Sequence, residues 1–91
     1  MKFQTYLKNK LKKHQLTQNK FAALVYRKDK HGQKIPYNRV TVSRWCNGRI
    51  PDIEAFFAIA SAISILENRD LSQVLNEIYQ LVGLPKPGGR K

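Results

Sequence analysis

A short polar segment of this sequence, Asn38-Arg39-Val40-Thr41-Val42-Ser43-Arg44-Trp45, carries side chains that suit the major groove of DNA. An arginine can donate two hydrogen bonds to O6 and N7 of a guanine, and a valine methyl group can contact the methyl group of thymine. If this segment is a helix, Val42, Trp45 and Cys46 face the core. The residues left toward solvent, which we predict to contact bases, are Asn38, Arg39, Val40, Ser43 and Arg44.

The positive charge of the chain is concentrated in its first half. The 91 residues hold 17 Lys and Arg against 6 Asp and Glu, a formal net charge of +11. Residues 1–50 contain 13 of the basic residues and one acid, whereas residues 51–91 contain four basic and five acidic residues. We therefore expect a polyanion such as DNA or RNA to bind the first half of the chain.

Five helices are expected to position the polar segment. Phe3, Leu7 and Leu11 recur every four residues, which is typical of an amphipathic helix. Thr17 suits the N-cap of a second helix, and Asp70 suits that of a last one. Helices are predicted over about residues 2–14, 17–25, 38–46, 51–65 and 70–82.

The apolar residues of these helices predict the core. The second helix is expected to bury Phe21, Leu24 and Val25. The expected apolar face of the fourth consists of Ile53, Phe56, Phe57, Ala60 and Ile63. That of the fifth consists of Leu71, Val74, Leu75, Ile78, Leu81 and Val82. The predicted fold class is all-α, a compact five-helix bundle with one domain at residues 1–83 and a flexible basic tail at 84–91.

Residues 26–37 interrupt the helical pattern with a polar, basic stretch. It is expected to form a loop, or a short hairpin that turns near Asp29–Gly32. Two interpretations stay open for its cations, either a basic wing that touches the DNA backbone or a solvated loop. The residues of this possible wing are Arg27, Lys28, Lys30 and Lys34, with His31 beside them.

Two stretches resemble the phage repressor/Cro-type helix-turn-helix family, Leu16-Thr17-Gln18-Asn19-Lys20-Phe21-Ala22 and Val40-Thr41-Val42-Ser43-Arg44-Trp45-Cys46-Asn47-Gly48-Arg49-Ile50-Pro51. With Ala58-Ile59-Ala60-Ser61-Ala62-Ile63, which resembles the family's fourth helix, the resemblance covers about residues 3–65. It implies that the first stretch opens a helix across the DNA backbone and that the second contains the recognition helix. The sequence departs from the family by about ten extra residues around 27–36.

The resemblance also implies separate roles for individual residues. Arg39, Val40 and Arg44 match the positions that read bases. Gln18, Asn47 and Arg49 match positions that contact DNA phosphate, and such contacts set the register of a protein on the duplex without reading its sequence. The further phosphate-contact candidates are Thr17, Lys20 and Thr41.

These observations predict a transcriptional regulator, a repressor that binds a palindromic operator in double-stranded DNA as a homodimer. The 70–82 helix is expected either to form the dimer interface or to close the core. An antitoxin-type or other protein-interaction module that also binds DNA is the alternative, and RNA binding ranks lower because the usual RNA-module patterns are missing.

Several other classes are not expected. No acid pair, Ser/His/Asp set or phosphate-binding glycine loop is present, so we expect no enzyme. His14 and His31 lack partners at metal spacing, and we expect no metal, other cofactor or small-molecule ligand. No apolar run approaches the ~20 residues of a membrane span. The single Cys46 fits a reducing compartment. We therefore expect a cytoplasmic protein of a prokaryotic cell, phage or mobile element.

Overall fold

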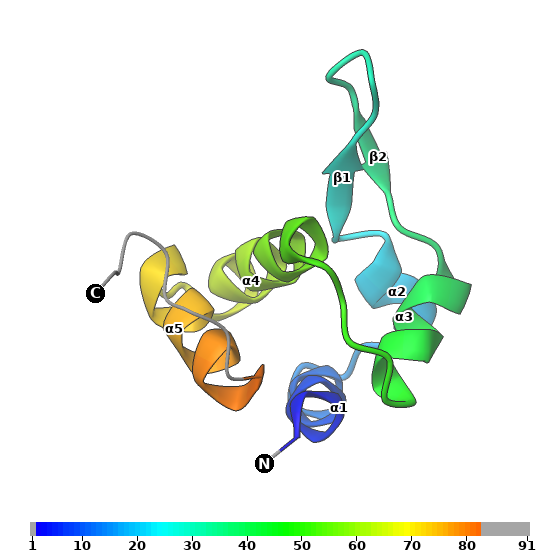
Figure 1. Cartoon of the computed structure of the whole chain (residues 1–91). Helices are drawn as coiled ribbons and strands as arrows, with labels where there is room; N and C mark the ends of the chain where they lie inside the picture. The colour runs from blue at the N-terminus through cyan, green and yellow to red at the C-terminus, as the bar shows by residue number, and fades with distance from the viewer. Residues whose placement is uncertain (1, 83–91) are drawn as a thin grey trace.

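The computed structural model describes residues 2–82 of the chain, which form five helices and one β-hairpin (Figure 1). The elements in chain order are α1 (Phe3–Lys13), α2 (Gln18–Ala22), β1 (Tyr26–Lys28), β2 (Lys34–Pro36), α3 (Arg39–Cys46), α4 (Ile53–Glu67) and α5 (Leu71–Val82). The predicted tail at 84–91 lies outside the described residues. None of the helices between residues 2 and 82 is long and apolar enough to cross a membrane.

Side-chain caps begin three of the helices near the predicted positions. Thr17 accepts a hydrogen bond from the backbone N–H of Lys20 at the start of α2. Asp52 does the same for Ala55 at the start of α4, with a distance of 2.8 Å. Such caps pair backbone N–H groups that have no partner within the helix. Helix α4 ends at Glu67, and the φ of its C-cap residue Asn68 is 52°, in the left-handed region.

The prediction of an all-α fold is wrong, because residues 26–36 form a two-stranded antiparallel sheet. Tyr26 pairs with Pro36, and Lys28 pairs with Lys34. The hairpin that was considered for this stretch is therefore present. It forms because Asp29 organises the turn, accepting hydrogen bonds from the backbone N–H groups of His31 and Gln33 at 2.9 Å each. The hairpin shortens the preceding helix, which ends at Ala22 rather than Val25.

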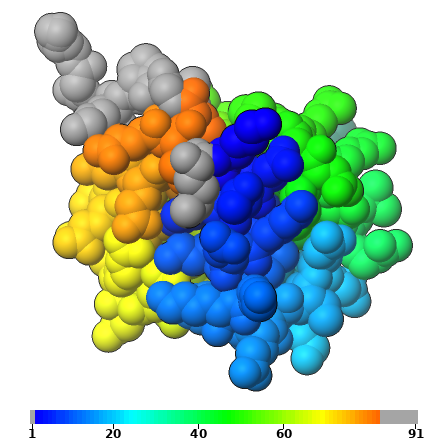
Figure 2. All heavy atoms as spheres, turned by 90° about the horizontal axis from the view of Figure 1, so that it is seen from below, coloured from blue at the N-terminus to red at the C-terminus, as the bar shows by residue number. Residues whose placement is uncertain are grey.

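The core lies where the five helices meet. Phe3 of α1 packs edge-on against Phe56 of α4, with ring centroids 5.2 Å apart. Figure 2 shows α1 at the surface between α5 and the segment that contains α3. The predicted core is correct in part. Leu24, Ile53 and Phe57 were expected to face inward, but each is exposed to solvent.

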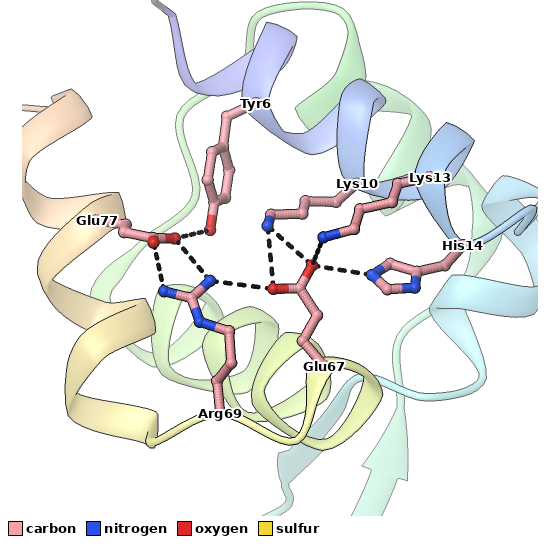
Figure 3. Close-up of polar contacts among 7 residues, drawn as sticks. All are labelled: Tyr6, Lys10, Lys13, His14, Glu67, Arg69 and Glu77. Atoms are coloured by element: carbon pink, nitrogen blue, oxygen red, sulfur yellow. Dashed lines mark hydrogen bonds and ion pairs between the residues drawn. The ribbon is translucent and has the colours of Figure 1, made fainter.

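A network of polar and ionic contacts joins α1 to the C-terminal end of α4 and to the middle of α5 (Figure 3). Its centre is Glu67, whose side chain is only 5% exposed and whose carboxylate accepts hydrogen bonds from Lys10, Lys13 and Arg69, with His14 Nε2 2.9 Å away. Burial alone would raise the pKa of the Glu67 carboxyl, but the hydrogen bonds from Lys10, His14 and Arg69 hold it well below its usual range. The network therefore favours the ionised carboxylate and fixes three helices together.

A second carboxylate extends the network into α5. Arg69 donates to Glu77 through both terminal guanidinium nitrogens, Nη1 and Nη2, and the hydroxyl of Tyr6 donates to Glu77 at 3.0 Å. The hydrogen bonds from Arg69 are the main reason that the pKa of Glu77 is lowered. Burial, reinforced by Glu77, raises the pKa of the Tyr6 phenol. Helix α5 is thus attached to α1 by polar contacts as well as by the core.

Candidate nucleic-acid interface

Helix α3 has one buried face and one exposed basic face, as its sequence predicts. Val42, Trp45 and Cys46 are buried in the core. Arg39, Val40 and Arg44 are exposed, and no acidic residue lies between Arg39 and Cys46. The exposed face therefore presents two guanidinium groups and an apolar valine to solvent.

Asn38, which is predicted to contact a base, caps the N-terminus of α3. Oδ1 of Asn38 accepts hydrogen bonds from the backbone N–H of Thr41 at 2.9 Å and from its hydroxyl at 3.0 Å. The amide oxygen of Asn38 is therefore occupied, and its amide nitrogen is the group left to meet a ligand. Thr41, predicted to contact phosphate, is half-buried and positions Asn38.

The C-terminal end of α3 brings further candidate residues together. Nδ2 of Asn47 donates to Oγ of the half-buried Ser43 at 3.4 Å. Gly48 follows with a φ of +109°, a conformation that residues with a Cβ rarely adopt. This turn lets the backbone N–H of Arg49 donate to the carbonyl of Arg44 at 2.9 Å. Both arginines are exposed, and both line the same surface hollow.

The start of α2 packs beside the end of α3. Lys20 is exposed, and Gln18 is half-buried with its side chain near the thiol of Cys46. Burial raises the pKa of that thiol against the opposing effects of Lys8 and Gln18, so Cys46 stays protonated and behaves as a small apolar residue. Gln18 thus lies at the junction of the two helices.

Tyr37 joins the hairpin to α3, and the sequence analysis missed it. Its backbone N–H donates to the carbonyl of Val25 at 2.9 Å, which closes the base of the hairpin. Its ring packs against Trp45 with centroids 5.1 Å apart. Burial, with Asp52 and Glu54 nearby, raises the pKa of its phenol, while Arg27 opposes the shift. The only sign of this role in the sequence is that an aromatic residue directly precedes the cap of α3.

A surface hollow of about 250 Å³ lies between α3 and the start of α4. Arg44 and Arg49 line one part of it, and Tyr37 and Trp45 supply aromatic surface. The carboxylate of Asp52 also lines it, but this group caps α4. The hollow therefore adjoins the basic face of α3.

The hairpin carries the cations that the sequence suggested as a basic wing on DNA. Arg27, Lys28, Lys30 and Lys34 are all exposed. Lys28 lies directly opposite Lys34, and two like charges at paired positions destabilise a sheet. The only acid of the hairpin, Asp29, is engaged by the turn. The hairpin extends away from the helices and leads through β2 into α3 (Figure 1). Among residues 2–82, no cluster of His, Cys, Asp and Glu could hold a metal ion.

The described elements define a small, mainly helical domain with a cationic hairpin beside a basic helix. The model of one protein family, the SP15 N-terminal domain, matches residues 7–74, which is most of the chain. The chain therefore belongs to the SP15 N-terminal domain family. The match includes α2, the hairpin, α3 and α4. No curated protein and no solved structure matches the chain.

Proposed function

We propose that this protein binds double-stranded DNA in a sequence-specific manner and acts as a transcriptional regulator, a repressor. The observation that carries the proposal is the division of α3 into a buried apolar face and an exposed face with Arg39, Val40 and Arg44. An α-helix fits the major groove, where each base pair presents a distinct pattern of hydrogen-bonding groups. The resemblance to the phage repressor/Cro-type family supports the same function.

In this proposal the base contacts come from the exposed face of α3. Arg39 and Arg44 each donate two hydrogen bonds to a guanine, and Val40 contacts a thymine methyl group. Asn38 contributes its amide nitrogen, because its oxygen caps the helix. Ser43 plays a smaller part, since it is half-buried and accepts a hydrogen bond from Asn47.

The phosphate contacts come from residues around both ends of α3. Arg49 and Asn47 are exposed just after the helix, and Lys20 is exposed on α2. Thr17 and Gln18 add polar groups at the start of α2, and Thr41 adds one at the start of α3. These contacts would fix the register of α3 in the groove rather than read bases.

The hairpin supplies a second set of phosphate contacts in this proposal. Its four cations lack an acidic partner within the hairpin, because Asp29 is engaged by the turn. A strand rises about 3.3 Å per residue, so the hairpin reaches about 15 Å beyond its base. That reach exceeds the ~12 Å width of the major groove. With α3 in the groove, the hairpin can thus contact the adjacent backbone, and phosphates would relieve the repulsion between Lys28 and Lys34.

We also propose that the protein acts in the cytoplasm, where the DNA of a prokaryotic cell, phage or mobile element is accessible. Cys46 supports this compartment, because it is the only cysteine of the sequence and its thiol is buried.

The decisive experiment is a selection of binding sites from random duplex DNA. The expected result is a short conserved sequence that contains guanines, bound at least a hundredfold more tightly than unrelated duplex in a fluorescence anisotropy assay. A selection that yields no preferred sequence would refute specific readout. Equal binding of single-stranded RNA and duplex would refute the proposed ligand.

The role of the hairpin has its own test, the dependence of affinity on salt. Replacing Lys28 and Lys34 by Gln should reduce the slope of log K against log salt by about 1.8, because each lost phosphate contact accounts for about 0.9. The control replaces Lys2 and Lys12, which are exposed at the ends of α1, and removes the same charge. Equal slopes for the two variants would exclude direct contact by the hairpin.

A further inference from the structure

The outward face of α4 carries large apolar side chains that are exposed to solvent. Ile53, Phe57 and Ile65 are 62%, 41% and 80% exposed. Together with Ser61 they are spaced four residues apart, so they form one stripe along the helix. The opposite face of α4 is buried in the core. This helix is therefore apolar on both sides, which is typical of a helix covered on both sides.

The charge of this surface distinguishes it from the rest of the molecule. Helix α4 contains no Lys or Arg, although the chain has a net charge of +11. Two copies of such a cationic protein repel one another wherever their basic surfaces meet. Two copies that meet at the α4 stripe bring together no Lys or Arg of α4.

The outer face of α5 lacks the corresponding apolar surface. Val74, Leu75, Ile78 and Tyr79 are buried in the core. The outward residues are Ser72, Gln73, Asn76 and Gln80, all of which are polar and exposed. Of the apolar residues that suggested the 70–82 helix as a dimer interface, Val74, Leu75 and Ile78 are buried in the core, and Leu71, Leu81 and Val82 are half-buried against it.

We infer that a second copy of this chain docks on the α4 stripe, which makes α4 the interface of a homodimer. In a twofold-symmetric dimer the same patch serves both partners, so a single self-complementary stripe is sufficient. Ser61, between Phe57 and Ile65, lets the two helices approach closely because its side chain is small. The stripe is short, so the association is expected to be weak and dependent on concentration.

Sedimentation equilibrium of the intact protein without DNA tests this inference, from micromolar to millimolar concentration. The wild-type protein is expected to change from monomer to dimer within this range. Replacing Ile53 and Ile65 by Glu should weaken the dimer at least tenfold, since each symmetric contact then brings acids together. Circular dichroism confirms that this variant is folded. The matched control replaces Gln73 and Gln80 on α5 by Glu and should dimerise like the wild type.

Three results would overturn the inference. The first is a wild-type protein that stays monomeric at every concentration, a result that holds whether or not the α4 variant folds. The second is a folded α4 variant that dimerises as tightly as the wild type. The third is loss of the dimer in the α5 control. None of these measurements includes DNA, so their outcome is independent of the proposed function.

Discussion

Replacing Glu67 by Gln is expected to destabilise the fold strongly at neutral pH. The carboxylate is 5% exposed and neutralises Lys10 on α1 and Arg69 just after α4. Gln keeps the shape of the side chain but removes the charge. Lys10 and His14, whose side chains are 16% and 18% exposed, then lose their acidic partner. Arg69 keeps Glu77.

The size of this effect follows from the burial of the groups. Removing one partner of a fully buried ion pair costs about 3–5 kcal/mol, because it leaves an uncompensated charge. The partners of Glu67 retain some solvent, and the Gln amide can still accept a hydrogen bond. We therefore expect a loss of about 2–3 kcal/mol, a large share of the ~5–14 kcal/mol that stabilises a domain of this length.

Urea denaturation followed by circular dichroism measures this loss at a series of pH values. The pKa of Glu67 is lower in the folded protein than in the unfolded chain, so its contribution is fully present above the ordinary glutamate pKa of about 4.3. The contribution is lost as the pH falls below that value. The difference between wild type and Glu67→Gln should therefore shrink steadily as the solution is acidified from about pH 4.

The control for this prediction is Glu54→Gln, which makes the same chemical change at an exposed position in the first turn of α4. It should lose well under 1 kcal/mol. The reasoning is refuted if Glu67→Gln loses no more stability than this control at pH 7. A difference from wild type that is independent of pH would also refute it.

Three further predictions concern the interface and the turns around it. Arg44→Ala should reduce the preference for one base at one position of each selected half-site, by about 1–3 kcal/mol. Gln18→Ala should instead weaken binding to all duplexes alike. Site selection and anisotropy distinguish the two effects. Gly48→Ala should cost about 1–2 kcal/mol in urea denaturation, because φ is +109° and the new Cβ would lie 2.8 Å from Gln4 Oε1. Asp52→Ala should cost about 1 kcal/mol in the same assay, because α4 loses its N-cap.

The sequence predicted the number of helices and the buried face of α3. Apolar spacing is a local property, so Val42 and Trp45 could be assigned to the core without knowledge of their neighbours. Caps were also readable, because Thr17 and Asn38 bond to backbone groups three residues away. The proposed roles of the base- and phosphate-contacting residues remain predictions.

Features that depend on tertiary contacts could not be predicted. The all-α assignment failed at residues 26–36, where the sequence offered a hairpin only as an alternative to a loop, because the strands are three residues long and contain no alternating apolar pattern. Phe57 has the spacing of a core residue, but α4 has apolar side chains on more than one face, so periodicity could not choose the inward one. Glu67 bonds to Lys10 and His14 across more than fifty residues, a pairing that no local pattern reveals.

The hydrogen bond between Val25 and Tyr37 has a consequence for how this domain can vary. The hairpin leaves the helical core and returns to it at the same point, so its length is uncoupled from the packing of α2 and α3. Doubling the length of such a loop costs only about 0.6 kcal/mol. This position is therefore a natural insertion point, at which a protein engineer could shorten, extend or exchange the segment while retaining the core.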